Sequence, residues 1–368
     1  MVIKIITCHD VVNYGASLQA LALQTYSSKL KHDVKIIDYL PSYMQMYNIW
    51  NVSPKSHLYK LSKYSSVFKL IYAFRTYLKL RATKGRIKAF KRFNSLYLNL
   101  TNHYETYEQI CQNPPIADLY IAGSDQIWST YLKNGRDAAF YLAFGNICTK
   151  RISYAASFGF SEIIGGFDCY VKSLLNNFNA ISVREQTGCN IVNKLGFKSV
   201  NVLDPVFLLS KNDWLELLNI KEPIIKNKYV LVYDLFHTDN RLNKYSSLLA
   251  NKYKLKIVAV NDVTETKYAD ININNAGPSE FVNLIYNAEY IIADSFHATA
   301  FSIIFKKQFY IFYNKANISR ISDLLSNINL TERLNSNAEL PNINWKNIDY
   351  HLNQKISESK NFLINNLK

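Results

Sequence analysis

Residues 288–305 read Ala-Glu-Tyr-Ile-Ile-Ala-Asp-Ser-Phe-His-Ala-Thr-Ala-Phe-Ser-Ile-Ile-Phe. The run from Tyr290 to Ala293 is short, apolar and rich in β-branched residues, which is typical of a buried parallel strand. Ser295 is a good helix N-cap, and Ala298 to Phe305 continues as an apolar helix. The stretch therefore predicts a parallel strand that turns directly into a helix, which is the repeating step of an α/β fold.

The turn between this strand and helix carries a candidate functional group, His297. It falls in the first helical turn, at the carboxyl edge of a parallel strand, where open α/β sheets bind their ligands. The helix start offers unpaired N–H groups and a positive dipole end, which favour a phosphate or a carboxylate. A capped core helix, with a histidine that only hydrogen-bonds its neighbours, explains the same spacing equally well.

Further strands are expected on both sides of this stretch. In the first half they fall at Ile3–Cys8, Val34–Tyr39, Asp118–Ala122, Arg151–Ser157, Ala180–Val183 and Val200–Leu203. In the second half they fall at Tyr229–Tyr233, Lys256–Val260, Ile271–Ile273 and Gln308–Tyr313. We predict an α/β protein with two Rossmann-like, doubly wound domains that face each other across a cleft. The predicted domains are residues 1–210 and 211–342, followed by a helical tail at 343–368.

A basic segment follows the second expected strand. No Asp or Glu occurs between Leu40 and Tyr104, whereas Lys and Arg are frequent and alternate with Tyr and Phe. We expect helices near His57–Arg81 and Gly85–Leu100, within a basic helical insertion at about residues 41–115. Bases with interfacial aromatic residues suit the anionic cytoplasmic leaflet of a membrane. A solvated face is the plain alternative, and we expect no nucleic acid because no recognised binding module is present.

The composition indicates a folded protein, and no cluster of His and carboxylate residues has the spacing of metal ligands. The chain has 368 residues, 48% of them hydrophobic, and a net charge of +15. Its five cysteines stand singly, which favours reduced thiols over a disulfide frame or a zinc site. No signal peptide or membrane span is visible. We expect a cytoplasmic protein without an obligatory metal, for which the cytoplasmic face of the membrane is a candidate site of peripheral attachment.

Several motifs occur in order along the chain. They are Ile6-Thr-Cys-His-Asp-Val-Val-Asn-Tyr-Gly-Ala-Ser-Leu-Gln-Ala20, Ala122-Gly-Ser-Asp-Gln-Ile-Trp128, Ser153-Tyr-Ala-Ala-Ser-Phe-Gly159, Ser182-Val-Arg-Glu185, Leu203-Asp-Pro205 and Asp294-Ser-Phe-His-Ala-Thr-Ala-Phe301. With them the chain resembles the polysaccharide pyruvyl transferase family over most of its length outside the basic segment. The resemblance implies a fold like the two-domain glycosyltransferases of the GT-B type. It also implies transfer of a pyruvyl group from phosphoenolpyruvate to two hydroxyls of one sugar. The product would be a ketal on a cell-surface glycan, such as a capsule or exopolysaccharide, or on its lipid-linked precursor.

The resemblance also suggests which residues bind the donor. Arg184 matches an arginine implicated in donor binding, and Arg320 is the nearest candidate for a second one. Many family members place Arg-Leu directly before the histidine, where this chain has Ser295-Phe296. Because phosphoenolpyruvate carries a carboxylate and a phosphate, its site needs cations or helix N-termini directed at both. Arg184 could instead pair with Glu185 or with a neighbouring helix.

His297 matches the family's functional histidine. We expect it to give a proton to the enol methylene of the donor and to take one from a sugar hydroxyl. Asp294, which precedes it by one helical turn, is expected to orient its imidazole. Four residues at other strand ends are expected on the acceptor side: Asn13, Tyr14, Asp125 and Gln126. Asp125 is equally well explained as a turn-capping aspartate.

Two other functions compete with this reading. A GT-B-type glycosyltransferase would use a nucleotide-sugar donor. Retaining members often hold that donor with a pair of glutamates, and the matching positions here are Asp294 and Ser302. The second alternative is a non-catalytic scaffold that binds glycan or lipid.

Overall fold

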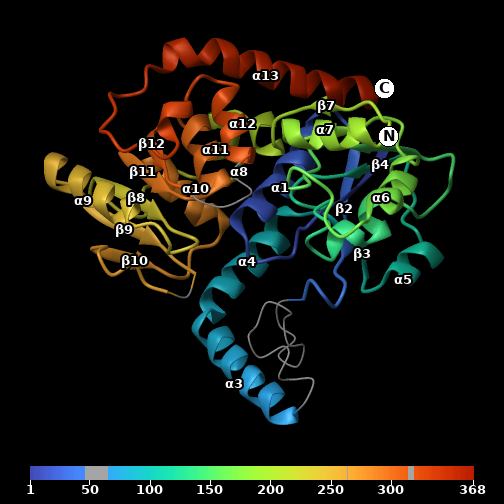
Figure 1. Ribbon diagram of the computed structural model, residues 1–368, viewed down its shortest axis with the longest axis horizontal. Coiled ribbons are helices and arrows are strands. Elements are labelled where there is room, and N and C mark those ends of the chain that lie inside the picture. The colour runs from blue at the N-terminus through green and yellow to red at the C-terminus, as the bar shows by residue number, and fades with distance from the viewer. Residues whose placement is uncertain (46–64, 263, 314–318) are drawn as a thin grey trace.

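The computed structural model describes residues 1–45, 65–262, 264–313 and 319–368. The first half of the chain forms a five-stranded sheet in the order β3-β2-β1-β4-β5 (Figure 1). Its strands are β1 (Val2–Ile6), β2 (Asp33–Tyr39), β3 (Leu100–Tyr104), β4 (Leu119–Ala122) and β5 (Lys150–Ser153). All neighbouring pairs are parallel. The short strands β6 (Ser182–Val183) and β7 (Val200–Asn201) continue the layer beyond β5 through isolated backbone bridges.

The helices of this half connect its parallel strands. They are α1 (Tyr14–Lys29), α3 (Ser66–Ala82), α4 (Lys84–Tyr97), α5 (Tyr107–Gln112), α6 (Asp168–Leu175) and α7 (Gln186–Lys194), with the 3₁₀ turns η1 (Asn134–Arg136) and η2 (Ala138–Tyr141). The helix α1 is buried along most of its length because it lies between the sheet and the second half of the chain.

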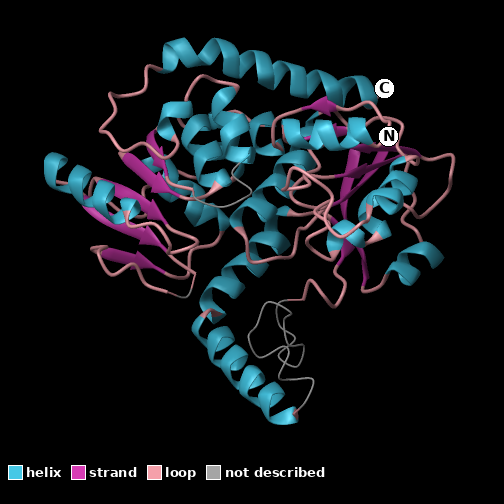
Figure 2. Ribbon diagram, in the orientation of Figure 1, coloured by secondary structure: helices cyan, strands magenta, loops and turns pink. Residues whose placement is uncertain are grey.

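The second half repeats this design, with a parallel sheet in the order β10-β9-β8-β11-β12. Its strands are β8 (Tyr229–Tyr233), β9 (Lys256–Val260), β10 (Ile271–Ile273), β11 (Tyr290–Ala293) and β12 (Gln308–Ile311). Its helices are α8 (Lys211–Leu217), α9 (Arg241–Tyr253), α10 (Pro278–Asn287), α11 (Phe296–Ile304) and α12 (Ser319–Ser326), followed by η4 (Thr331–Arg333). Figure 2 shows the strands in two separate groups with helices around them. The prediction of two doubly wound α/β domains facing each other is confirmed.

Strand order reverses at the same place in both sheets. In the first sheet β1 lies between β2 and β4, and in the second β8 lies between β9 and β11. Chain connections therefore leave in opposite directions from β1 and β4, and likewise from β8 and β11. In open α/β sheets the loops diverge at this point and leave a crevice beyond the carboxyl ends of the strands.

One hydrophobic core joins the two halves. It contains Leu18 of α1 and Phe281 of α10, and the ring of Tyr14 stacks on that of Phe281 with centroids 4.2 Å apart. The short turn η3 (Pro205–Leu208) packs against both α1 and α11. Because buried apolar surface is continuous across the boundary, burial stabilises the two halves as one unit.

The predicted tail forms the helix α13 (Trp345–Asn366), which lies along both halves (Figure 1). Near its start, Asp349 pairs with Lys306 of the second half at 2.6 Å. Further along, the Ser359 hydroxyl accepts a hydrogen bond from the Leu203 backbone N–H of the first half at 2.9 Å. The helix therefore acts as a strap between the halves. Within the described ranges, no helix is long and apolar enough to cross a membrane.

The basic helical insertion predicted at about residues 41–115 is not confirmed. The strand β3 lies within that range, and Phe90 and Phe93 of α4 belong to the main core. Most of the segment is therefore an enlarged connection between β2 and β3 and part of the domain itself. Lys55, Lys60 and Lys63 of the predicted basic segment lie outside the described residues.

Candidate functional site

A cavity of about 360 Å³ lies where the carboxyl ends of the two sheets meet. It is lined by Asn13, Tyr14, Gly15, Asp125, Gln126, Tyr233, Leu235, Phe236, Asp294, Ser295, Phe296, His297, Tyr313, Arg320 and Ile321. Apart from the last two, which belong to α12, these residues follow the ends of β1, β4, β8, β11 and β12. The volume is within the range of about 300–1,000 Å³ that is usual for small-molecule pockets. Both strand-order reversals therefore open into one pocket.

All the site residues predicted from the sequence line this cavity except Arg184. Arg184 is buried behind the wall, and its guanidinium lies over the ring of Phe296, 4.8 Å from the centroid. Through Phe296 and Asp125, which do line the cavity, Arg184 is connected to it indirectly.

Two helices begin at the cavity. The Asn13 side chain caps α1 by accepting the Ala16 N–H at 3.2 Å, and the Ser295 side chain caps α11 by accepting the Ala298 N–H. Each cap satisfies one of the N–H groups that a helix leaves unpaired at its start. The positive ends of both helix dipoles therefore face the same pocket, an arrangement that favours an anionic ligand.

His297 is held between the two halves of the chain. Its Nε2 atom lies 3.6 Å from Oδ2 of Asp204. This nitrogen is buried and has no hydrogen-bond partner among the described residues. On the opposite side is Gly15 of α1. A Cβ atom at position 15 would lie 1.9 Å from Nδ1 of His297, so only glycine leaves room for the imidazole here. The sequence pattern around Gly15 suggested a turn and did not indicate this contact.

Asp204 joins Arg184 to His297. Its Oδ2 accepts a 2.7 Å hydrogen bond from Nη1 of Arg184, and its Oδ1 accepts one from the Val206 N–H at 3.1 Å. Burial by itself would raise the pKa of Asp204, but the neighbouring His297 and Arg184 outweigh burial and hold that pKa well below its ordinary value. Asp204 is therefore an ionised carboxylate next to the imidazole.

Asp204 lies in the Leu203-Asp204-Pro205 motif, but the sequence alone does not predict its contact with His297. Its position directly after the expected strand Val200–Leu203 was the available signal, because residues at the ends of strands line the ligand edge of the sheet.

Arg184 and Arg320 bring two positive charges to one side of the cavity. In Arg184, Nε and Nη2 have no hydrogen-bond partner among the described residues, although Nη2 lies 3.6 Å from Oδ1 of Asp125. The Nε atom of Arg320 also lacks a partner within the described part of the chain. Burial, together with repulsion from Arg184, lowers the pKa of Arg320. Buried donors without acceptors are costly, so Arg320 is suited to an anion that would accept from it in the cavity, while Arg184 adds positive charge behind the wall.

Asp294 lies at the end of β11 and is buried. Its two oxygens accept the backbone N–H groups of Leu235 at 2.8 Å and Phe236 at 3.0 Å. Burial, with a smaller contribution from the charge of Asp234, raises the pKa of Asp294 to about 7. A cavity-lining carboxyl with this pKa can exchange protons near neutral pH. Its expected role in orienting His297 stays a prediction, since the carboxylate observed beside the imidazole belongs to Asp204.

The residues expected on the acceptor side lie on the wall formed by the first half. The Tyr14 hydroxyl donates to the Ala276 carbonyl at 3.0 Å, which directs it across to the second half. Asp125 has a left-handed backbone (φ 66°), and its carbonyl accepts the Ser157 N–H at 3.0 Å. Its side chain is 21% exposed and lines the cavity. Gln126 follows it along the same wall.

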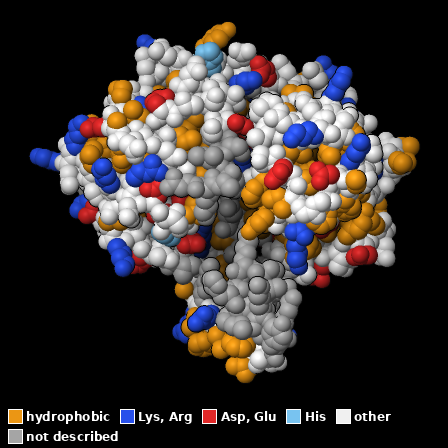
Figure 3. Space-filling view, in the orientation of Figure 1, with side chains coloured by type: hydrophobic (Ala, Val, Ile, Leu, Met, Phe, Trp, Pro, Cys, Tyr) orange, Lys and Arg blue, Asp and Glu red, His pale blue; other side chains and the backbone are white. Residues whose placement is uncertain are grey.

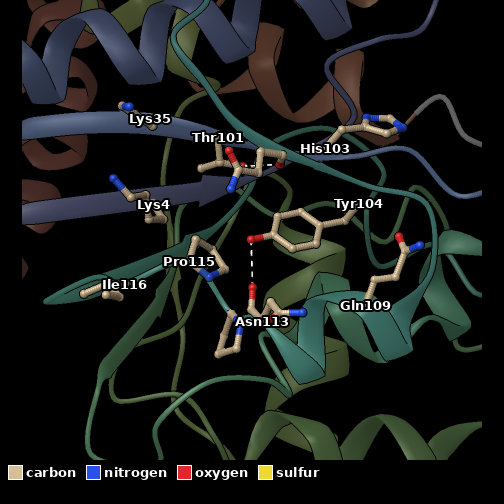
Figure 4. A pocket seen from close by; sticks show the side chains of 11 residues that line it. Lys4, Lys35, Thr101, His103, Tyr104, Gln109, Asn113, Pro115 and Ile116 are labelled. Carbon is tan, nitrogen blue, oxygen red and sulfur yellow. Dashed lines mark hydrogen bonds between the residues drawn. The ribbon is translucent and has the colours of Figure 1, made fainter.

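A larger hollow of about 800 Å³ lies against the first sheet and is made by β1, β2, β3 and the segment around α5 (Figure 4). Lys4 and Lys35 stand at one side of it, and the Tyr104 hydroxyl donates to the Asn113 carbonyl at 2.8 Å. The hollow contains none of the residues at the strand-order reversals. His103 does line it, paired with Asp38 at 2.9 Å, but the hollow lies away from the edge where the two sheets meet.

No metal site is evident in the part of the chain that the structure describes, where no group of three His, Cys, Asp or Glu side chains could hold an ion. The cavity instead combines an imidazole, a carboxyl with a raised pKa, two helix N-termini and the guanidinium of Arg320, with Arg184 behind the wall. This set can bind an anion and move protons.

The chain is remotely similar to several solved structures. It is 9% identical to UDP-GlcNAc 2-epimerase from Neisseria meningitidis bound to UDP-GlcNAc, with a TM-score of 0.48 over 100% of this chain and 99% of that chain. It is 8% identical to ADP-heptose lps heptosyltransferase II of E. coli, with a TM-score of 0.41 over 98% and 100% of the two chains. The UDP-GlcNAc 2-epimerase from Methanocaldococcus jannaschii gives 13% identity and a TM-score of 0.44 over 97% and 92%.

Comparison with curated proteins gives no match. A family model described as polysaccharide pyruvyl transferase matches residues 13–316, which include every cavity-lining residue except Arg320 and Ile321. The matched range also contains Arg184 and Asp204. The chain belongs to the polysaccharide pyruvyl transferase family and is a transferase.

Proposed function

We propose that the cavity binds phosphoenolpyruvate and that the enzyme transfers its pyruvyl group to two hydroxyls of one sugar. The product is a pyruvate ketal on a cell-surface polysaccharide or on its lipid-linked precursor. The observation that supports an anionic donor most directly is Arg320, which lines the cavity with the capped start of α11 and has a buried Nε without a partner among the described residues. No separate cofactor is invoked, because phosphoenolpyruvate itself carries the reactive group.

The donor has two anionic groups, which occupy different parts of the cavity. The phosphate and the carboxylate both require positive partners, and Arg320 with the Ser295-capped helix start can receive one of them inside the cavity. Arg184 lies behind Phe296 and Asp125, so its contribution is a positive potential at that wall. The α1 helix start provides a further positive end across the cavity.

The chemistry requires proton transfer at three moments. A proton goes to the methylene carbon of the enol, and a sugar hydroxyl attacks the resulting cationic carbon and loses its own proton. The C–O bond to phosphate then breaks, and phosphate leaves with the electron pair. The second hydroxyl attacks the same carbon and loses its proton, which completes the ketal. Two C–O bonds and one C–H bond have formed, while one C–O bond, two O–H bonds and the C=C π bond have broken, and the surplus proton leaves on phosphate.

His297 is assigned to the first proton transfer. The ionised Asp204 at 3.6 Å compensates positive charge on its imidazole, and Gly15 fixes the position of the ring. Asp294, with a pKa of about 7, is present in both protonation states near neutral pH and is assigned as a second proton carrier. The sugar is assigned to the wall of Asn13, Tyr14, Asp125 and Gln126.

The function is tested by offering phosphoenolpyruvate to the purified protein together with a panel of aryl and lipid-linked hexosides. We expect phosphate release that depends on the acceptor, and a sugar product heavier by one pyruvyl unit in mass spectrometry. The His297→Ala protein should release almost no phosphate, whereas His351→Ala, on the exposed surface of α13, should behave as the unchanged enzyme. Consumption of a UDP-sugar without use of phosphoenolpyruvate would contradict the proposal in favour of glycosyl transfer.

A further inference from the structure

The helix α3 projects from the body of the protein, below the two sheets in Figure 1. Five apolar residues of α3 recur at helical spacing and lie on one face of it. They are exposed to different degrees: Val67 (58%), Leu70 (58%), Ile71 (38%), Phe74 (62%) and Leu78 (46%). An amphipathic helix in a globular protein normally turns its apolar face toward the core. Here that face, named the α3 stripe, points outward.

Positive charge surrounds the α3 stripe. Exposed basic residues on α3 and α4 include Lys69, Arg75, Arg81, Lys84, Lys88 and Arg92. The sequence from Leu40 to Tyr104 has no acidic residue to balance them. In the space-filling view, hydrophobic and basic side chains gather together on the projecting lobe (Figure 3). A surface that combines exposed apolar groups with a cluster of exposed bases is complementary to an anionic lipid interface.

A second copy of the chain is a poorer occupant for the same surface. Joining two α3 stripes would bring two sets of basic residues together without acidic partners, and like charges repel. The stripe is also only one face of a single helix, which is small for a stable protein interface. A bilayer accepts the apolar side chains while its anionic headgroups pair with the bases. The helix is too short and too basic to span the bilayer, so it would lie in the plane of the interface.

The position of α3 relative to the cavity gives this surface a use. The next helix, α4, fixes α3 to the body: Arg86 donates to the Asn261 carbonyl at 2.6 Å, and its guanidinium lies 4.6 Å from the centroid of the Tyr14 ring. Phe90 also packs on Tyr14, with ring centroids 5.2 Å apart. Because Tyr14 lines the cavity, these contacts connect the projecting helix with the wall of the cavity assigned to the sugar.

We propose that α3 docks the enzyme on an anionic membrane surface by inserting the α3 stripe between lipid headgroups. The inference rests on the proposed function in one respect, namely that docking presents the cavity to an acceptor carried on a lipid. The contact itself requires only the exposed residues of α3 and α4.

The experiment measures co-sedimentation of the full chain with vesicles of phosphatidylcholine and phosphatidylglycerol, and with vesicles of phosphatidylcholine alone. We expect binding to the anionic vesicles that weakens as salt is added. The Leu70→Glu/Phe74→Glu variant should bind at least about tenfold more weakly, since it removes two inserted side chains and adds negative charge. The matched control, Ile116→Glu/Ile147→Glu, changes two residues that are 90% and 89% exposed elsewhere, and it should bind as well as the unchanged protein.

Three results would overturn the proposal. One is failure of the unchanged protein to bind anionic vesicles, and another is equal binding by the α3 variant. The third is a protein that does not bind vesicles but forms a dimer in solution, with the dimer lost in the α3 variant. A second copy of the chain would then be what covers the α3 stripe. Turnover of a water-soluble aryl hexoside is measured in parallel and should be unchanged in the α3 variant. Vesicle binding without turnover of any acceptor would contradict the proposed reaction while leaving the docking inference intact.

Discussion

Asp204, from the first half of the chain, places Oδ2 3.6 Å from Nε2 of His297, from the second half. The same oxygen accepts a 2.7 Å hydrogen bond from Arg184. The buried carboxylate of Asp204 thus connects His297, which is assigned to proton transfer, with Arg184 behind the wall of the cavity. The contact crosses the boundary between the two sheets, so it depends on how the halves are packed.

Replacing Asp204 with Asn keeps the shape but removes the negative charge. We expect kcat to fall about a hundredfold, because charge on the imidazole is no longer compensated. We also expect a loss of stability on the order of 3 kcal/mol, because Arg184 is left as a buried cation with weaker partners. Kinetics and denaturant unfolding measure the two effects. Asp168→Asn, at an exposed position in the first turn of α6, is the control and should change neither appreciably.

The Gly15→Ala substitution tests the contact between α1 and the imidazole. The added Cβ would lie 1.9 Å from Nδ1 of His297, so the ring has to move. We expect kcat/KM to fall at least about tenfold, because moving a catalytic imidazole by about 1 Å from its reactive position slows the reaction strongly. Circular dichroism should show an intact fold. The neighbouring Ser17→Ala change removes a buried hydroxyl without adding atoms, and an equal loss of activity there would contradict this explanation.

Arg320 is expected to act on the donor and not on the fold. The Arg320→Gln variant should raise the KM for phosphoenolpyruvate by about ten- to a hundredfold, which corresponds to loss of a charge-assisted hydrogen bond. Because the buried guanidinium has an unsatisfied nitrogen and a lowered pKa, the ligand-free variant should be as stable as the unchanged protein or more so. Phosphoenolpyruvate should raise the Tm of the unchanged protein and not that of the variant. A large drop in the ligand-free Tm would instead indicate a structural role.

Asp294 should make stability depend on pH in a definite direction. Its pKa rises from 3.8 in the unfolded chain to about 7 in the folded protein. Between these two pH values the folded protein keeps a proton that the unfolded chain has lost. Its contribution to the free energy of unfolding is therefore present at low pH and is lost as pH rises toward about 7. The slope is at most about 1.4 kcal/mol per pH unit. Unfolding curves of Asp294→Asn, compared with the unchanged protein across this range, should lack this slope, and identical pH profiles would count against the raised pKa.

Much of the fold could be predicted because its strands are buried on both faces. The strands β8, β9, β10 and β11 begin and end at the predicted residues, since β8, β9 and β11 are mostly apolar runs with clear polar limits. The strand β3 was missed. Its sequence, Leu100 to Tyr104, contains Thr, Asn and His and is partly exposed at the sheet edge, so it lacks the apolar signal. Without β3, the connection between β2 and β3 resembles an insertion in the sequence.

The site was predictable to the extent that it follows from strand ends. Asp125 and His297 lie on different halves, yet both come directly after parallel strands, and the rule for open sheets places them at one edge. The contacts of His297 with Asp204 and Gly15 could not be predicted in this way. They depend on the packing of two domains against each other, and no local spacing in the sequence encodes that packing.

The strap formed by α13 has a consequence for how the enzyme is made. The Ser359 hydroxyl holds the backbone N–H of Leu203, and the next residue is Asp204, the carboxylate beside His297. During synthesis both sheets and every residue that lines the cavity emerge from the ribosome before α13 does. The segment that carries Asp204 gains this anchor only when α13 arrives. A chain cut short before α13 would therefore contain every group that lines the cavity, while the segment beside His297 would lack the hydrogen bond that α13 provides.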